Sequence, residues 1–313
     1  MKSSESASAA DTSGHATFGG PSGAAYGVSA VLAGVAALTA GASFFFWDLF
    51  ERDVPMTVGN MRGTALTMLV IAVPVLIGSM VLSSRGSSRA WFVWLGSLAY
   101  IAYNAVMFCF ALQFNSYFLL FVALLALSFW ALVTLLSQSD RVANDDGATG
   151  VPVRTIAVYM LTCLVLFAMM WLRDIVPATV GNVLPDSFEG TGLTQNPIYV
   201  LDFAFTFPLL AIGAVWLWRR RAWGYVIGGM MVVTLTIETA GIAIDQVFGH
   251  LHDRSASLGA VPIMVVLTVI GLVFSALFLR GMGTPRQQPT FRRSSSRHAA
   301  GLTSSLNRNT SSD

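Results

Sequence analysis

Long apolar runs alternate with short polar connections along the chain. Eight of these runs approach the length of about twenty residues that an α-helix needs to cross a bilayer. They are Ala24–Trp47, Gly63–Leu82, Trp91–Phe114, Leu119–Leu136, Thr155–Leu172, Ile198–Trp218, Gly224–Phe248 and Pro262–Leu279. Only residues 115–118 separate the third and fourth runs, but one unbroken helix would be far longer than a bilayer is thick. The pattern predicts an all-α integral membrane protein with eight transmembrane helices.

The composition agrees with this class. Hydrophobic residues make up 55% of the chain and charged residues 11%, whereas soluble domains contain about 25% charged residues. The mean hydropathy is +0.67. A net charge of +2 from scattered bases argues against nucleic-acid binding. The two cysteines, Cys109 and Cys163, lie inside apolar runs, so neither a disulfide framework nor a zinc–cysteine site is predicted.

Basic residues set the predicted orientation, because Lys and Arg are retained on the cytoplasmic side of a membrane. With the N-terminus inside, the cytoplasmic segments hold fourteen bases: Lys2, Arg85, Arg89, Arg141, Arg154, Arg219, Arg220, Arg221, Arg280, Arg286, Arg292, Arg293, Arg297 and Arg308. The outer segments hold four: Arg52, Arg62, Arg173 and Arg254. Both termini are therefore predicted to be cytoplasmic. Seventeen arginines against one lysine suggest a high-GC bacterial genome, hence a bacterial inner membrane.

Three polar segments flank or join the spans. Residues 1–23 are rich in Ser, Ala and Gly and are not expected to be a cleaved signal peptide. Residues 137–154 are predicted to be a cytoplasmic linker, and residues 281–313 a basic tail. Both terminal segments are predicted to be disordered, because they have too little apolar surface to bury. A second interpretation is that the tail contacts anionic lipid through Arg286, Arg292, Arg293 and Arg297.

The chain contains an internal repeat. Segment 52–60 reads RDVPMTVGN and segment 173–182 reads RDIVPATVGN, so eight of nine aligned positions are identical once Ile175 is treated as an insertion. Further landmarks recur in the same order: Pro74 and Pro208, Gly78 and Gly213, Arg-Ala-Trp at 89–91 and 221–223, and Gln113 and Gln246. We expect residues 24–136 and 155–280 to be duplicated four-helix halves. Because four is even, the halves are parallel repeats about an axis along the membrane normal, an arrangement common in transporters.

Three carboxylates lie within the predicted spans, where a charge is costly and therefore a functional candidate. Asp202 lies in span six, with Thr206 one turn away, and Glu238 and Asp245 lie in span seven. Thr234, Glu238, Gly241 and Asp245 form one stripe at helical spacing. Asp202 and Asp245 are alternatively explained as solvated acids near helix ends. Glu238 is either a protonated acid that bonds a neighbouring helix or a proton or cation site.

The repeated segments place Arg52 with Asp53, and Arg173 with Asp174, at the predicted outer mouth of each half. The simpler interpretation is a pair of turns with ion pairs, with Val-Pro extended and Gly-Asn in a tight turn. The alternative is that the two segments frame an outer vestibule, which residues 183–197 cap. The interior prolines, Pro74 and Pro208, are predicted to kink their helices around a central space.

A weak metal signal lies in the last predicted outer loop, at His250, His252 and Asp253. A third ligand would come from Asp245, Asp186 or Glu189, but solvated loop histidines are the simpler interpretation. The spans hold no histidine and the last span no lysine, which disfavours a bis-histidine haem and a retinal Schiff base. The sequence leaves the cofactor unknown.

These features favour a small-solute or ion transporter, or a channel-like protein, with its site between the two halves. A non-transporting sensor, scaffold or assembly factor is the first alternative. An enzyme that acts on lipid or envelope substrates is the second, because of the histidines near the outer carboxylates. The sequence identifies neither the substrate nor the oligomeric state.

Overall fold

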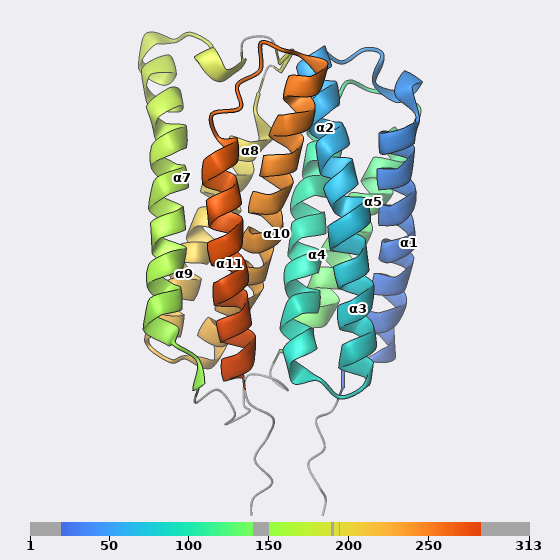
Figure 1. Cartoon of the computed structure of the whole chain (residues 1–313). Helices are drawn as coiled ribbons and strands as arrows, with labels where there is room; N and C mark the ends of the chain where they lie inside the picture. The colour runs from blue at the N-terminus through green and yellow to red at the C-terminus, as the bar shows by residue number, and fades with distance from the viewer. Residues whose placement is uncertain (1–19, 140–149, 189–190, 194, 283–313) are drawn as a thin grey trace, which may run out of the picture.

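The structure is a computed structural model that describes residues 20–139, 150–188, 191–193 and 195–282. Over these residues it is helical, without strands, and eight helices are long and apolar enough to cross a membrane. The predictions of an all-α architecture and eight spans are confirmed: the chain is a multi-pass membrane protein (Figure 1). Most of the predicted N-terminal segment, linker and basic tail, including the arginines proposed to contact lipid, lies outside the described residues.

The helices follow the chain in order. Six spans are single helices: α1 (Gly23–Phe45), α4 (Ser88–Phe110), α5 (Phe118–Leu136), α7 (Val153–Gly181), α10 (Ala222–His252) and α11 (Val261–Gly281). Span two consists of α2 (Pro55–Thr67), η2 (Met68–Ala72) and α3 (Val73–Ser84). Span six consists of α8 (Pro197–Leu201), η5 (Asp202–Thr206) and α9 (Phe207–Trp218). Short 3-10 turns, η1 (Trp47–Phe50) and η4 (Asp186–Phe188), lie in two connections at the upper end of Figure 1.

The two copies of the repeated segment differ in local structure. The tight turn predicted at Gly59 and Asn60 is wrong, because α2 starts at Pro55 and both residues are helical. Proline suits the first turn of a helix, where its missing N–H has no partner to lose. In the second copy α7 continues through Pro177, and Asn182 ends it in the left-handed conformation with φ 51°. Hydropathy underestimated the length of α2 and α7, because both helices extend past the apolar runs that predicted them.

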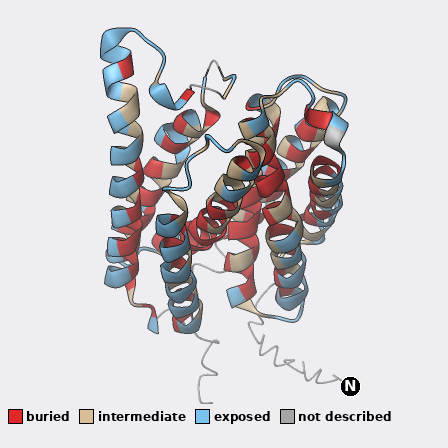
Figure 2. Ribbon diagram, turned by 45° about the horizontal axis from the view of Figure 1, so that its top comes forward, coloured by how far each residue is buried: buried red, intermediate tan, exposed pale blue. Residues whose placement is uncertain are grey.

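One helix, α10, occupies the middle of the bundle. It packs against α9 and α11 and also against α2 and α4 of the first half. In the apolar stretch of α10, 72% of the residues are buried inside the bundle. In the apolar stretch of α11, 22% are. Figure 2 shows buried residues along the faces that meet inside the bundle and exposed residues on the outward faces. We conclude that α10 joins the first four spans to the last four, and that α11 faces mainly outward.

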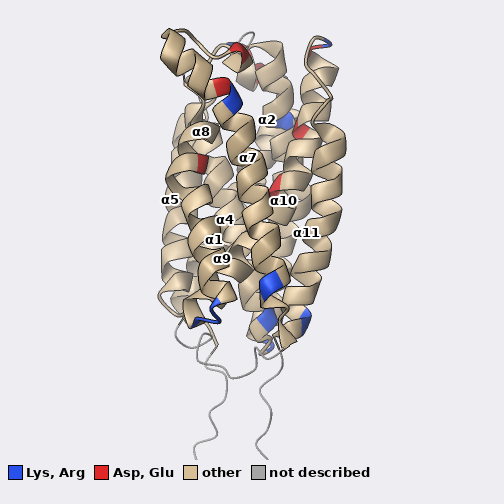
Figure 3. Ribbon diagram, turned by 90° about the vertical axis from the view of Figure 1, so that its left-hand side faces the viewer, with Lys and Arg blue, Asp and Glu red and all other residues tan. Residues whose placement is uncertain are grey.

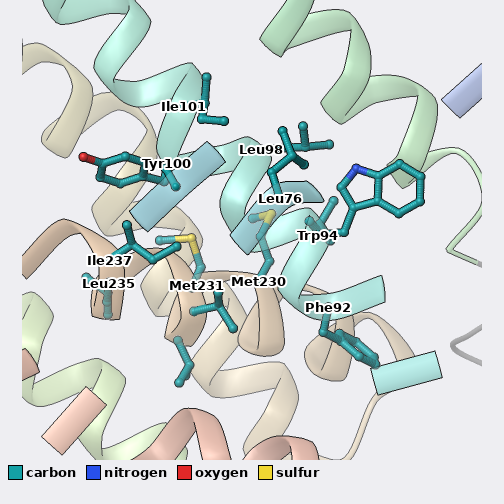
Figure 4. Close-up of a cluster of buried hydrophobic side chains, with 14 of the residues drawn as sticks. Leu76, Phe92, Trp94, Leu98, Tyr100, Ile101, Met230, Met231, Leu235 and Ile237 are labelled. Carbon is teal, nitrogen blue, oxygen red and sulfur yellow. The ribbon is translucent and has the colours of Figure 1, made fainter. Parts of the chain in front are cut away.

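Large side chains fill the contact between α4 and α10. Figure 4 shows this cluster, to which α4 contributes aromatic and aliphatic side chains, α10 two methionines with Leu235 and Ile237, and α3 Leu76. The labelled members are Leu76, Phe92, Trp94, Leu98, Tyr100, Ile101, Met230, Met231, Leu235 and Ile237. All ten are buried. The contact between the halves is thus a packed apolar core over much of its length.

Glycines allow α10 to approach α2 and α4 closely. A Cβ atom on Gly63 of α2 would overlap the Cα atom of Asp245, and one on Gly59 would overlap the backbone at Phe248. On α4, a Cβ atom on Gly96 would lie 2.6 Å from the Cβ of Val233. Small residues at this spacing let membrane helices pack backbone to backbone. The contact between α2 and α10 therefore depends on the absence of side chains at Gly59 and Gly63.

A π-helical turn precedes the proline in both broken spans. The Val73 N–H bonds to the Met68 carbonyl, and the Phe207 N–H bonds to the Asp202 carbonyl. Proline has no N–H and its ring excludes the carbonyl four residues earlier, so a widened turn accommodates it. Pro74 and Pro208 both lie on exposed sides of their helices. The rings therefore face outward rather than lining a central space.

We predict that Gly63→Ala destabilises the protein. The added methyl group would force α2 away from α10, which should lower the free energy of unfolding by about 1–3 kcal/mol. Gly78→Ala is the matched control, because a Cβ atom there meets nothing within 4 Å. Thermal unfolding of the two purified variants in detergent measures the difference. Equal melting temperatures would show that the two helices are not in backbone contact.

Candidate functional site: an intramembrane polar cluster

Charged residues are distributed unequally along the bundle. At the lower end of the molecule in Figure 3 the described charged residues are all arginines: Arg85, Arg89, Arg154, Arg219, Arg220, Arg221 and Arg280. The described acidic residues lie in the middle or towards the upper end, where α2 begins. Three of these acids, Asp202, Glu238 and Asp245, belong to the spans.

Asp202 is held by side chains from two other spans. It opens the π turn of span six and is 7% exposed. Its Oδ2 accepts a hydrogen bond from Trp171 Nε1 of α7 at 2.7 Å, and its Oδ1 accepts one from the Tyr103 hydroxyl of α4 at 3.2 Å. The hydroxyl of Thr206, one turn away, donates to the Leu201 carbonyl at 3.5 Å. Asp202 is thus enclosed by protein groups rather than solvated at a helix end.

Glu238 points towards α4. Asn104 Nδ2 donates to its Oε2 at 3.0 Å and to the backbone carbonyl of Tyr100 at 3.1 Å. One turn below, the Thr234 hydroxyl donates to the carbonyl of Gly96, also on α4, at 3.1 Å. Thr234 and Glu238 of the predicted stripe therefore lie on the face of α10 that meets α4, and the Glu238 carboxylate contacts protein there.

Asp245 lies two turns above Glu238, where Gly63 of α2 meets α10. Its Oδ1 is buried without a hydrogen-bond partner. Glu238 lies within electrostatic reach of both Asp202 and Asp245. Asp202, Glu238 and Asp245 each lie at a contact of span six or α10 with α4 or α2, and we call these three residues the acidic cluster.

Arg62 lies at the level of this cluster. We placed it in an outer loop, but it belongs to α2 and is 6% exposed. Its guanidinium donates to the Phe44 carbonyl at 2.6 Å and lies 5.6 Å from the centre of the Phe44 ring. The predicted span begins at Gly63 because Arg62 interrupts the apolar run, so hydropathy leaves Arg62 outside the helix.

The repeated segments make different contacts from those predicted. Arg52 donates to the Phe114 carbonyl at 3.1 Å, and Asp53 Oδ1 accepts from the Gln113 N–H at 2.8 Å. Asp174 accepts from the hydroxyls of Ser187 and Tyr199, the latter at 2.6 Å. Neither acid pairs with its adjacent arginine, so the ion pairs within predicted turns are wrong.

The chain after α7 reaches the start of α2. The Thr57 hydroxyl donates to the Thr191 carbonyl at 3.0 Å, and Gly192 approaches Val54. Residues 191–192 therefore cover the first repeated segment. The second repeated segment instead bonds, through Asp174, to Ser187 and Tyr199.

The sequence predicts His250 and His252 in an outer loop. This is wrong, because both belong to the last turn of α10. His250 Nδ1 lies 2.8 Å from the Ala256 carbonyl, and His252 Nδ1 lies 2.9 Å from the Phe248 carbonyl. Within the described residues no group of three or more His, Cys, Asp or Glu is placed to hold a metal ion. Glu189, one suggested third ligand, lies outside them.

Sequence reasoning missed the partners of the acidic cluster. Tyr100, Tyr103 and Asn104 occur at spacings of three and four residues, so they share one face of α4. An asparagine inside an apolar span is the signal that would have found this face. Trp171 lies near the end of a predicted span, where interfacial tryptophans are common, but its indole N–H donates to Asp202.

The fold and this cluster define a multi-pass helical membrane protein with one buried carboxylate, Asp202, and two partly exposed ones, Glu238 and Asp245, within its spans. Comparisons with known protein families, with curated proteins and with solved structures find no match.

We predict that Asp53→Asn stabilises the protein at neutral pH. Burial raises the pKa of the Asp53 carboxyl above its ordinary value of 3.8, although the hydrogen bond from the Gln113 backbone opposes this shift. The native state therefore holds the proton more tightly than the unfolded chain, and stability falls as pH rises through the native pKa. Asparagine keeps the acceptor oxygen without ionising.

Melting temperatures at mildly acidic and at neutral pH measure the effect. Asp253→Asn is the matched control, because hydrogen bonds from Ser255 lower the pKa of Asp253 and its contribution has the opposite sign. If Asp53→Asn is less stable than the parent at neutral pH, the ionised Asp53 carboxylate stabilises the native state. That result would contradict a native-state pKa above the ordinary value.

Proposed function

We propose that the chain consists of two duplicated, parallel four-helix halves. Three structural landmarks of the first half recur 134 residues later in the second. The π turn at 68–72 recurs at 202–206, and Pro74 recurs at Pro208. The left-handed residue that ends the span, Gly86 with φ 88°, recurs as Arg220 with φ 54°. One constant offset holds across the whole of spans two and six. It supports duplication more strongly than the two repeated outer segments do, because these differ in conformation.

The proposed orientation places the arginine-rich end in the cytoplasm of a bacterium and the acid-rich end outside. The distribution of described charges along the bundle supports it, because basic residues are retained on the cytoplasmic side. Both termini are then cytoplasmic, and α2 begins at the outer surface.

We predict that a cysteine at Ser255 reacts from outside the cell and a cysteine at Ser84 does not. Both positions are exposed, and they lie at opposite ends of the bundle. A membrane-impermeant thiol reagent is applied to intact cells and to permeabilised cells, with Cys109 and Cys163 replaced by alanine. Labelling at Ser84 alone in intact cells would reverse the orientation.

For activity, we propose a transporter in which the acidic cluster exchanges a proton or another small cation. The single observation that supports this is that Asp202 and Glu238 lie inside the bundle with neutral partners: Trp171, Tyr103 and Asn104. An ionised carboxylate in a membrane is costly unless a proton or cation neutralises it. Binding and release of that positive charge is the chemistry that these residues support best.

The position of the cluster also supports transport. Asn104 and Tyr103 belong to the first half, whereas Asp202, Glu238 and Trp171 belong to the second. A change in the charge of Asp202 or Glu238 therefore alters a contact between the halves. In transporters built from repeats, coupling-ion sites lie at such a contact, and one repeat moves against the other.

A non-transporting scaffold is the second candidate. The observation that favours it is the backbone contact of α2 with α10 at Gly59 and Gly63, which closes one side of the contact between the halves. In a scaffold, Glu238 would serve only to hold α4 and α10 together through Asn104. No described arrangement of the histidines supports the enzyme alternative.

We predict that Glu238→Gln abolishes proton movement. The full chain is reconstituted into liposomes with a trapped pH-sensitive dye, and a potassium gradient with valinomycin imposes a membrane potential, with and without a panel of small solutes. Because glutamine carries no exchangeable charge, flux should fall by at least about tenfold. Asp253→Asn, at an exposed acid outside the cluster, should match the parent.

Proton flux separates the two candidates, and thermal unfolding checks that the variants fold. Glu238→Gln should keep its melting temperature in either case, because the amide still bonds to Asn104. If the parent moves no more protons than empty liposomes with any solute, and Glu238→Ala only lowers the melting temperature, the scaffold stands instead.

A further inference from the structure

Tyr100 of α4 carries a buried hydroxyl without a partner. The residue is 1% exposed, and its hydroxyl makes no hydrogen bond. Figure 4 shows the ring beside the apolar cluster and the hydroxyl directed away from it. Buried polar groups in proteins nearly always have a hydrogen-bond partner, such as a protein group or an ordered water. The orphaned hydroxyl therefore indicates a small polar occupant.

The hydroxyl packs closely against Gly241 of α10. A Cβ atom on Gly241 of α10 would lie 3.2 Å from the Tyr100 oxygen and 3.4 Å from Cγ2 of Thr67 on α2. Gly241 is three residues after Glu238 and four before Asp245, so all three share one face of α10. The Tyr100 hydroxyl thus lies at a height between the two carboxylates, and it interacts electrostatically with both.

A second orphaned atom belongs to the same region. Asp245 Oδ1 is buried without a hydrogen-bond partner, although the residue as a whole keeps part of its surface exposed. Asp245 lies within the last two turns of α10, near the upper end of the bundle. It is therefore the member of the acidic cluster on α10 that is nearest to the outer solution in the proposed orientation.

We propose that Asp245 and Tyr100 form a proton route from the outer surface to Glu238, with water held beside Gly241. This inference rests on the proposed function, in which Glu238 exchanges a proton. A proton from outside joins the carboxylate of Asp245 and passes through water to the Tyr100 oxygen. The phenol then releases its own proton towards Glu238, so only O–H bonds form and break and the hydroxyl is restored.

The other charged and titratable groups around Glu238 do not provide this route. Asp202 of η5 is engaged by Trp171 and by Tyr103, the other tyrosine on this face of α4. Arg62 of α2 is directed to the Phe44 carbonyl. Towards the lower end, α10 has no acidic or basic residue between Arg221 and Glu238. The ionisable path on α10 therefore leads outward.

The test measures how fast Glu238 takes up a proton. The full chain in lipid nanodiscs receives a proton jump from a photolysed caged acid, and time-resolved infrared spectroscopy follows the carboxylic acid C=O band. Glu238→Gln assigns the band by removing it. Tyr100→Phe and Asp245→Asn should each slow protonation of Glu238 by about tenfold or more, since each removes a proton-transfer group.

Two matched controls accompany these variants. Tyr26→Phe also removes a buried hydroxyl without a hydrogen-bond partner, but near Trp94 at the other end of the bundle. Asp253→Asn removes an exposed outer carboxylate. Both should protonate Glu238 at the parent rate. Melting temperatures identify any variant that fails to fold. If Asp245→Asn fails to fold, Tyr100→Phe alone decides the test.

Parent-like protonation rates in Tyr100→Phe, or in a folded Asp245→Asn, would overturn the route. The proposed function fails separately: a Glu238→Gln variant that still moves protons in liposomes would contradict transport through Glu238, whatever the infrared rates are. Loss of flux in Glu238→Gln together with unchanged rates in Tyr100→Phe would leave the transporter and remove only this path.

Discussion

The close approach of α10 to α2 and α4 determines the rest of the structure. Glycines at positions 59, 63 and 96 leave room for the backbone and side chains of α10, so this helix lies in the middle of the bundle with neighbours from both halves. Glu238 lies on the side of this helix that packs against α4, and the polar face of α4 supplies Asn104 as its hydrogen-bond donor.

Burial of the acids in protein also explains the choice of their partners. Asp202 bonds to an indole and a phenol, and Glu238 bonds to a carboxamide. These donors stabilise a carboxylate without cancelling its charge, whereas a lysine or arginine would fix it as an ion pair. A carboxylate held in this way remains able to bind and release a proton or cation. The same contacts join the two halves, so charge and helix packing are coupled at this place.

Much of the fold was predictable because the number of spans depends on hydropathy alone, and eight apolar runs became eight helices. Helix ends were less predictable. Arg62, His250 and His252 are polar but helical, since a helix continues as long as its backbone is satisfied, whatever the polarity of its side chains. The three carboxylates were found because charge in an apolar run is rare. Their partners Tyr103, Asn104 and Trp171 were not, because amphipathic residues in a span are compatible with packing, with interfaces and with binding alike.

The central claim is that Glu238 is held between the halves by Asn104, and a double-mutant cycle tests it most directly. Unfolding free energies are measured for the parent, Asn104→Ala, Glu238→Ala and the double variant. A hydrogen bond to a charged group in this contact should give a coupling energy of about 1.5–3 kcal/mol. A coupling energy indistinguishable from zero would mean that the two side chains do not meet. Of the acidic cluster, only Asp202, through Tyr103, would then join the two halves.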